Sequence, residues 1–226
     1  MTAKIIVLTV MCVLLCVQMG VYIHYKLQKK GRAYTLSKCA GSLIFTLTAF
    51  GSMLFAKPDG YTVLILCATV LSSVGDYFLS LPHGHHRLKA GAGAFAAAHC
   101  FFVIAFMLVG GFHWQTIPFI VLIFLLELLG ARLIKLNFRG AGKSAASYIL
   151  VVTTMAVTAC SLLFADAMPK TAAWLTAMGG TLFLLSDILW MLYGLDKDVP
   201  NKVFKALNVV TYFPAVMLIA SALYFR

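Results

Sequence analysis

The chain contains eight apolar stretches, each near the length needed to cross a lipid bilayer. They cover residues 5–23, 39–56, 61–81, 88–109, 117–133, 144–164, 172–192 and 207–225. A hydrocarbon core of about 30 Å requires roughly 20 apolar residues in a helix, because an α-helix rises about 1.5 Å per residue. With 62% hydrophobic and 11% charged residues, the composition excludes an ordinary soluble domain. We therefore predict an all-α polytopic membrane protein, a bundle of eight transmembrane helices that forms a single domain over residues 1–226.

The basic residues predict how the bundle is oriented in the membrane. Of the 18 Lys and Arg residues, 14 fall around the loops after the first, third, fifth and seventh stretches. The other four are Lys4, Lys57, Lys170 and Arg226. Because cytoplasmic loops are enriched in Lys and Arg, these four basic loops are predicted to face the cytoplasm and both termini to lie outside. The basic loops also attract anionic headgroups, so we expect membrane lipids as partners and no nucleic acid.

Two acidic residues lie inside apolar stretches in similar local sequences, Gly75-Asp76 and Ser186-Asp187. A carboxylate in hydrocarbon costs roughly 2.5 to 3.5 kcal/mol or more, so intramembrane acidic residues usually have a function. Each lies about five residues before the cytoplasmic end of its stretch, which predicts a common depth. A common depth favours a functional pair over two separate hydrogen bonds that only join helices. The spacing of the two stretches also suggests two related four-helix halves in parallel orientation.

Other polar residues are predicted to lie near this depth. Gly91, Phe95 and His99 share one helix face, which places a buried imidazole where it can exchange a hydrogen bond with a carboxylate. Glu127 has no basic residue at helical spacing, so it is neutral, paired with another helix, or lining a cavity. Further polar groups at or above the depth of the Asp pair are Tyr148, Asn208 and Tyr212.

The sequence carries no pattern typical of a metal or disulfide site. Its six cysteines are scattered through the apolar stretches without metal-type spacing. The histidine-rich segment 83–87 has no acidic or thiol ligand nearby and is interpreted as an exposed loop. We expect no metal and no other cofactor.

Several of these segments resemble the lysoplasmalogenase (YhhN-like) family of eight-helix membrane proteins, over most of the chain. The segments are Gly75-Asp76, Ala98-His99, Tyr148, Gly179-Gly180, Ser186-Asp187 and Thr211-Tyr212-Phe213. Lys38 matches a family lysine that Pro usually follows, whereas Cys39 follows here, and Pro214 also departs from the family pattern.

The resemblance implies hydrolysis of the sn-1 vinyl ether bond of lysoplasmalogens, which releases a fatty aldehyde and glycerophosphoethanolamine or glycerophosphocholine. Protonation of the outer alkene carbon gives an oxocarbenium ion that water captures. This chemistry requires one neutral carboxylic acid and one carboxylate, as in glycoside hydrolysis. Asp76 and Asp187 are the candidate catalytic residues, with neither role assigned to either. The candidate substrate-binding or supporting residues are His99, Tyr148, Tyr212, Ser186, Lys38 and Asn208.

A lysophospholipid that enters from the inner leaflet would place its phosphate near Lys38 and its vinyl ether at the Asp pair. Three other readings remain open. Paired intramembrane carboxylates with a histidine are also used by small proton-coupled transporters. A metal-dependent lipid amidase would need at least three converging ligands, and only His99 is available inside the membrane. The third alternative is a lipid-binding membrane protein without catalytic activity.

Overall fold

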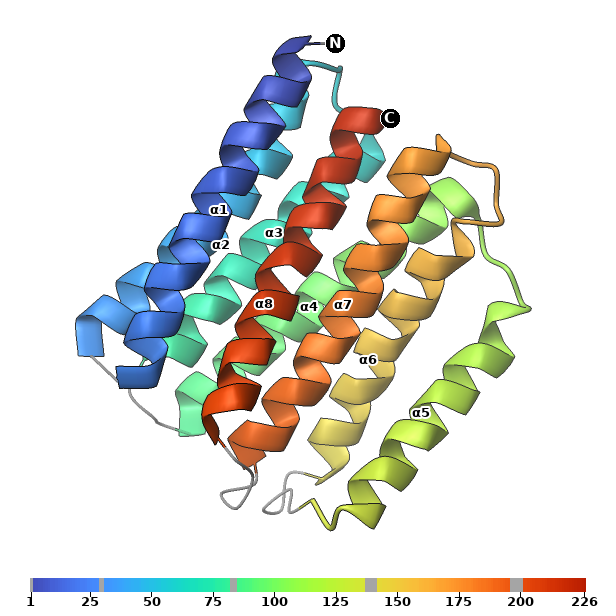
Figure 1. Ribbon diagram of the computed structural model, residues 1–226. Helices are drawn as coiled ribbons and strands as arrows, with labels where there is room; N and C mark the ends of the chain where they lie inside the picture. Colours follow the sequence, from blue (N-terminus) through green and yellow to red (C-terminus); the bar gives the residue numbers. More distant parts are fainter. Residues whose placement is uncertain (1, 29–30, 82–84, 137–141, 196–200) are drawn as a thin grey trace.

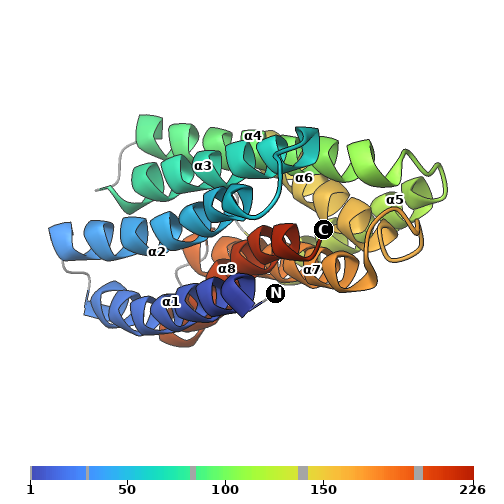
Figure 2. The ribbon, with the colours of Figure 1, turned by 90° about the horizontal axis from the view of Figure 1, so that it is seen from above.

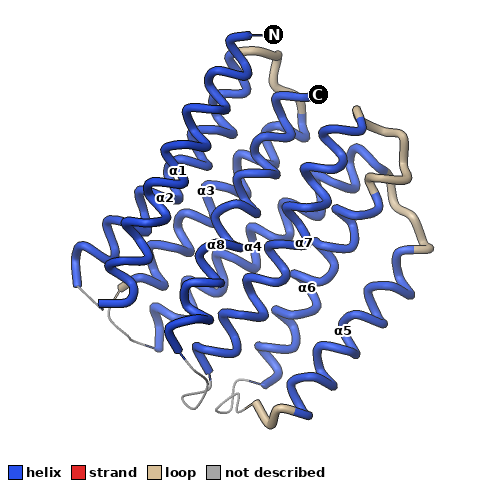
Figure 3. Tube along the Cα trace, in the orientation of Figure 1, coloured by secondary structure: helices blue, strands red, loops and turns tan. Residues whose placement is uncertain are grey.

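The computed structural model describes residues 2–28, 31–81, 85–136, 142–195 and 201–226 as a bundle of α-helices (Figure 1). The helices are α1 (Thr2–Gln28), α2 (Gly31–Gly51), α3 (Gly60–Ser80), α4 (His85–Gly110), α5 (Thr116–Leu133), α6 (Gly142–Ser161), α7 (Lys170–Leu195) and α8 (Asn201–Ala222). Two short 3-10 helices follow α2 and α8, at Ser52–Leu54 and Leu223–Phe225. The described part of the chain contains no strand, and loops join the helix ends (Figure 3).

The prediction of an all-helical protein with membrane-spanning helices is confirmed for the described residues, apart from the exact number of crossings. By length and composition, seven described helices, α1 and α3 to α8, are long and apolar enough to cross a membrane. Helix α2 has the same length as α3, 21 residues, but is more polar. Its polar residues include Ser37, Ser42 and Thr48, and these are buried inside the bundle. They lower the hydropathy of α2 without facing lipid, and a crossing by all eight helices stays a prediction.

Helix α2 begins eight residues earlier than the apolar stretch 39–56 predicted, at Gly31. Its first two turns are polar, and an apolar pattern cannot detect a helix that continues through polar residues. The backbone there still satisfies its own hydrogen bonds, which favours helix near a membrane. Lys38 therefore lies inside α2 and not in the loop before it.

The first four helices and the last four make similar but not identical contacts, because α1 packs on both α2 and α8 whereas α5 packs mainly on α6. In each half the third and fourth helices pack along one another, α3 with α4 and α7 with α8. The second helix of each half also packs against the fourth helix of the other, so that α2 contacts α8 and α6 contacts α4. Seen from above, these helices form the body of the bundle, with α5 at one edge (Figure 2).

Glycines hold these helix pairs close together. A Cβ atom added at Gly75 in α3 would lie 2.6 Å from the ring of Phe95 in α4. A Cβ atom added at Gly179 in α7 would lie 2.7 Å from the backbone oxygen of Ala215 in α8. Small residues permit such an approach of helices in a membrane, where packing replaces the hydrophobic effect as the driving force.

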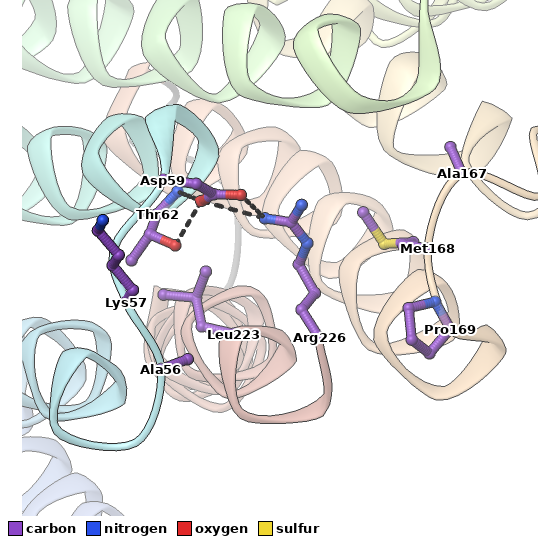
Figure 4. Close-up of a pocket in the computed structure, with 9 residues that line it drawn as sticks. All are labelled: Ala56, Lys57, Asp59, Thr62, Ala167, Met168, Pro169, Leu223 and Arg226. Carbon is purple, nitrogen blue, oxygen red and sulfur yellow. Dashed lines mark hydrogen bonds and ion pairs between the residues drawn. The ribbon is translucent and has the colours of Figure 1, made fainter.

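Both chain ends lie at the same end of the bundle, which we name the outer end (Figure 1). Asp59 caps α3 there by accepting hydrogen bonds from the backbone N–H and the hydroxyl of Thr62, and Arg226 Nη1 lies 3.0 Å from its carboxylate. Burial raises the pKa of Asp59, but the Thr62 hydrogen bonds and the Arg226 charge outweigh this, so its pKa lies below the usual value. These residues line a pocket of about 270 Å³ (Figure 4).

Candidate functional site

Asp76 is fully buried near the inner end of α3, opposite the outer end. Lys38 Nζ lies 2.9 Å from its Oδ1 atom. The hydroxyl groups of Ser42 and Tyr212 both donate hydrogen bonds to Oδ2, the Tyr212 bond measuring 2.8 Å. A carboxylate that accepts two hydrogen bonds and contacts an ammonium group is stabilised in its ionised form.

Helices α2 and α8 bring these three partners to Asp76. Lys38 and Ser42 are one helical turn apart, so both reach the same side of α2. Gly41 lets α8 approach, because an added Cβ there would lie 2.5 Å from the Phe213 ring. Tyr212 is thereby held against α2 and α3. Ser42 was not among the predicted site residues, although its spacing of four from Lys38 was a usable signal.

Asp187 on α7 has a different set of partners. The Tyr148 hydroxyl donates a 2.8 Å hydrogen bond to Asp187 Oδ2, and His99 Nε2 lies 3.2 Å from the same oxygen. His99 is fully buried, and its ring packs edge-on against Phe183 at a centroid distance of 4.6 Å. Within the described residues, no Lys or Arg forms an ion pair with Asp187. Its carboxyl group is therefore held by a phenol and an imidazole, without the ammonium partner that Asp76 has.

Aromatic rings join the two carboxyl clusters. The Phe183 ring lies 5.4 Å from the Tyr212 ring and 6.4 Å from the Phe95 ring, measured between centroids. Both Asp76 and Asp187 act electrostatically on Tyr148 and on Tyr212. The structure thus brings the two predicted carboxyl groups into adjoining clusters with an apolar aromatic layer between them. An apolar layer of this kind strengthens electrostatic interactions with any charge that forms nearby.

The remaining two predicted site residues form a third contact at the inner side. The Asn208 side-chain N–H donates to the backbone oxygen of Ser186 at 2.9 Å, and Asn208 Oδ1 accepts from Lys26 Nζ at 2.8 Å. Ser186 directly precedes Asp187, so this contact is connected to the second carboxyl cluster through one peptide unit. Lys26 is one of the 14 basic residues that were predicted only to mark the cytoplasmic side. Lys26 lies in the last turn of α1, on the same helix face as the buried Tyr22. This shared face was the feature that could have indicated a buried lysine.

Glu127 lies outside both carboxyl clusters. The Thr153 hydroxyl of α6 donates a 2.6 Å hydrogen bond to it, so of the three predicted alternatives the pairing with another helix is observed. Its second oxygen, Oε1, is buried and has no hydrogen-bond partner among the described residues. This bond joins the peripheral helix α5 to α6.

Parts of the predicted loops lie outside the described residues, namely His83, Lys29, Lys30, Arg139 and Lys197. The prediction of an exposed loop over 83–87 is wrong for residues 85–87, which form the first turn of α4. Within the described residues, no group of three or more His, Cys, Asp or Glu side chains is arranged to hold a metal ion.

Comparison with known families gives a match over most of the chain. The model of the YhhN family matches residues 33–223, which include both carboxyl clusters. The chain belongs to the YhhN family. This is the lysoplasmalogenase family, so membership supports a lysoplasmalogenase-type function at the family level and confirms the predicted resemblance. Neither the curated proteins nor the solved structures give a match to this YhhN protein.

Proposed function

We propose that this YhhN protein hydrolyses the sn-1 vinyl ether bond of lysoplasmalogens to a fatty aldehyde and glycerophosphoethanolamine or glycerophosphocholine. The observation that carries the proposal is the unequal environment of two buried carboxyl groups in adjoining clusters. Asp76 faces an ammonium group, whereas Asp187 is held by Tyr148 and His99. Hydrolysis of a vinyl ether needs one carboxyl group as the acid and the other as an anion, and unequal environments separate the two roles.

Asp187 is the acid in this proposal. Its carboxyl group transfers a proton to the outer alkene carbon, and the electron pair of the double bond forms the new C–H bond. The inner carbon and the ether oxygen then share the positive charge of an oxocarbenium ion. Tyr148 and His99 position Asp187 by holding its Oδ2 atom. The ionised Asp187 left by this step is the base for the next one, as the acid/base residue is in glycosidases.

Asp76 is the anion that stabilises the oxocarbenium ion. Its ion pair with Lys38 and its two hydroxyl donors keep it ionised while the positive charge forms. Water adds to the inner carbon and loses a proton to Asp187, which gives a hemiacetal. The hemiacetal then collapses to the aldehyde and the free glycerol hydroxyl, so that one water is consumed for each ether bond broken.

We place this site in the cytoplasmic half of the membrane, in one domain whose eight helices all cross the bilayer. The basic loops then face the cytoplasm and both termini lie outside, with the carboxyl clusters toward the basic side. Asp76 is four residues from the inner end of α3, and Asp187 is eight residues from that of α7. A single-chain lysophospholipid would therefore enter from the inner leaflet.

Aldehyde release tests the proposal. The purified protein in lipid is incubated with lysoplasmenylethanolamine, beside Asp76→Asn and Asp187→Asn, with Asp166→Asn as the matched control. Asp166 is exposed in an outer loop at φ 45°, a conformation that Asn tolerates. We expect aldehyde from the wild type and Asp166→Asn, and a loss of at least about a hundredfold in both site variants. The assay is repeated with lysoplasmenylcholine, and folded wild type that releases no aldehyde from either lipid would refute the proposal.

The second candidate is a proton-coupled transporter, which the buried contact between His99 and Asp187 also favours. Such a protein would move a substrate in response to a proton gradient and would release no aldehyde. Flux measured in vesicles beside the aldehyde assay separates the two candidates.

A further inference from the structure

The hydrogen bonds to Asp187 all end on one of its two carboxyl oxygens. The Tyr148 hydroxyl oxygen lies 2.8 Å from Oδ2, and His99 Nε2 lies 3.2 Å from it. The other oxygen, Oδ1, accepts no hydrogen bond from any described residue, and the protein does not enclose it, since 11% of the side chain is exposed. Asp76 differs, because Lys38 contacts its Oδ1 and two hydroxyl groups donate to its Oδ2. Of the two carboxyl groups, Asp187 is the one whose Oδ1 is left to face a substrate.

The surroundings of His99 indicate which of its ring nitrogens carries hydrogen. A neutral imidazole has one N–H donor and one acceptor, whereas an imidazolium has two donors. Nδ1 is buried and has no hydrogen-bond partner among the described residues. A hydrogen on Nδ1 would leave a buried donor unpaired, which is rarer in proteins than an unpaired acceptor. The hydrogen therefore lies on Nε2, where Asp187 Oδ2 at 3.2 Å and the Tyr148 oxygen at 3.3 Å are in reach to accept it.

The donors around Oδ2 decide where a neutral Asp187 carries its acidic proton. The Tyr148 hydroxyl donates its one hydrogen to Oδ2, and the Nε2–H group of His99 faces the same oxygen. An oxygen that accepts from these groups acts as the carbonyl oxygen of the acid. A proton on Oδ2 would instead need His99 Nε2 as its acceptor, and this would move the imidazole hydrogen to the buried Nδ1 atom. Oδ1 has no such competitor within the described part of the chain.

We propose that Asp187 carries its acidic proton on Oδ1 and that His99 keeps it there as a neutral imidazole, by donating from Nε2 to Oδ2. This inference rests on the proposed function and names the oxygen that acts in it. Oδ1 gives its proton to the outer alkene carbon, and the electron pair of the O–H bond stays on Oδ1, which later takes a proton from the attacking water. His99 is a positioning residue that keeps its own hydrogen throughout. The proton relay of a transporter would instead pass the proton through His99.

Infrared spectra of the resting protein test the position of the proton without turnover. A neutral Asp187 gives a carboxylic acid carbonyl band that is absent in Asp187→Asn. With the proton on Oδ1 the carbonyl oxygen is Oδ2, so Tyr148→Phe removes a hydrogen bond to it and should shift the band to higher frequency. Tyr224→Phe is the control, because its hydroxyl donates to the backbone oxygen of Thr48 at the outer end, and it should leave the band unchanged. No such band from Asp187, or an unchanged band in Tyr148→Phe, would overturn the inference.

Two substitutions of His99 test the role of its Nε2–H group. A Gln amide reaches the position of Nε2 and donates to Oδ2 but cannot take up a proton, whereas an Asn amide reaches only the position of Nδ1. We expect His99→Gln to keep kcat for lysoplasmenylethanolamine within about tenfold of the wild type, and His99→Asn to lower it about a hundredfold or more. His113→Gln, at an exposed histidine in the loop after α4, should have no effect. Equal losses in folded His99→Gln and His99→Asn would show that His99 carries the proton and would overturn the inference.

Failure of the proposed function gives a different result from failure of this inference. If the wild type releases no aldehyde while the Asp187 band still shifts in Tyr148→Phe, the proposed function fails and the placement of the proton stands. Nitrogen-15 NMR of histidine-labelled protein gives a direct readout of His99. We expect the signals lost in His99→Gln to come from an imidazole with hydrogen on Nε2 alone. Hydrogen on Nδ1, or on both nitrogens, would overturn the inference even when aldehyde is released.

Discussion

The ion pair between Lys38 and Asp76 permits a quantitative prediction of stability. Its side chains are only 11% and 1% exposed, so water screens the pair little. Asp76→Asn leaves the Lys38 ammonium group buried without its counter-charge, which costs about 3–5 kcal/mol of unfolding free energy. Lys38→Met should cost an amount toward the lower end of this range, because the hydroxyl donors Ser42 and Tyr212 still bind the carboxylate. The double variant carries no unpaired charge. Its loss of unfolding free energy should therefore be smaller than the sum of the two single losses by about 2 kcal/mol or more.

The measurement is reversible unfolding of the four proteins in mixed micelles, combined as a double-mutant cycle. A matched cycle on the exposed pair of Asp59 and Arg226 serves as the control, for which we expect a coupling of about 0–1 kcal/mol. Losses that add to within about 0.5 kcal/mol in the Lys38 and Asp76 cycle would refute the reasoning. The carboxylate would then not depend on the ammonium group for its stability, and its assignment as the anion of the site would lose its main support.

Three further predictions concern other parts of the bundle. Tyr148→Phe removes one hydrogen bond to the second carboxyl group and should lower the unfolding free energy by only about 0.6 to 1.7 kcal/mol, while lowering kcat at least tenfold with little change in KM. Gly75→Ala introduces a Cβ atom 2.6 Å from the ring of Phe95 and should destabilise the protein by about 1–3 kcal/mol, whereas Gly93→Ala, with nothing within 4 Å, should not. The lowered pKa of Asp59 contributes stability that is complete above the usual Asp pKa of about 4 and is lost as the pH falls through the lower, folded-state pKa. Asp59→Asn should remove this part of the dependence of the unfolding free energy on acid pH. An unchanged pH profile of unfolding in this variant would contradict the prediction.

The acidic residues of the site could be predicted from the sequence because a carboxylate in an apolar stretch is conspicuous. Asp76 and Asp187 interrupt runs of apolar residues, and their partners His99 and Tyr148 lie inside apolar stretches as well. The helical spacing of His99 from Phe95 and Gly91 then predicted a face that is buried in the structure. These inferences needed only the cost of charge in hydrocarbon and the period of a helix.

The lysines could not be placed correctly in the same way. Lys26 and Lys38 stand at the borders of apolar stretches, where a basic residue normally faces the aqueous interface. The structure instead turns both into the bundle, one against Asn208 and the other against Asp76. Hydropathy scores each residue alone and cannot recognise a charge that a residue from a distant helix compensates. The same limitation placed the start of α2 too late.

The cross-packing of the two halves has a consequence for what kind of chain can form such a site. Asp76 is held by α2 from its own half and by α8 from the other, and Asp187 is held by α6 from its own half and by α4 from the other. Neither half alone therefore completes a cluster. Two identical four-helix chains could build both clusters only as a symmetric pair, and symmetry would give both carboxyl groups identical neighbours. A single chain whose two halves differ in sequence has no such symmetry, which is the condition for one carboxyl group to give up a proton while the other stays charged.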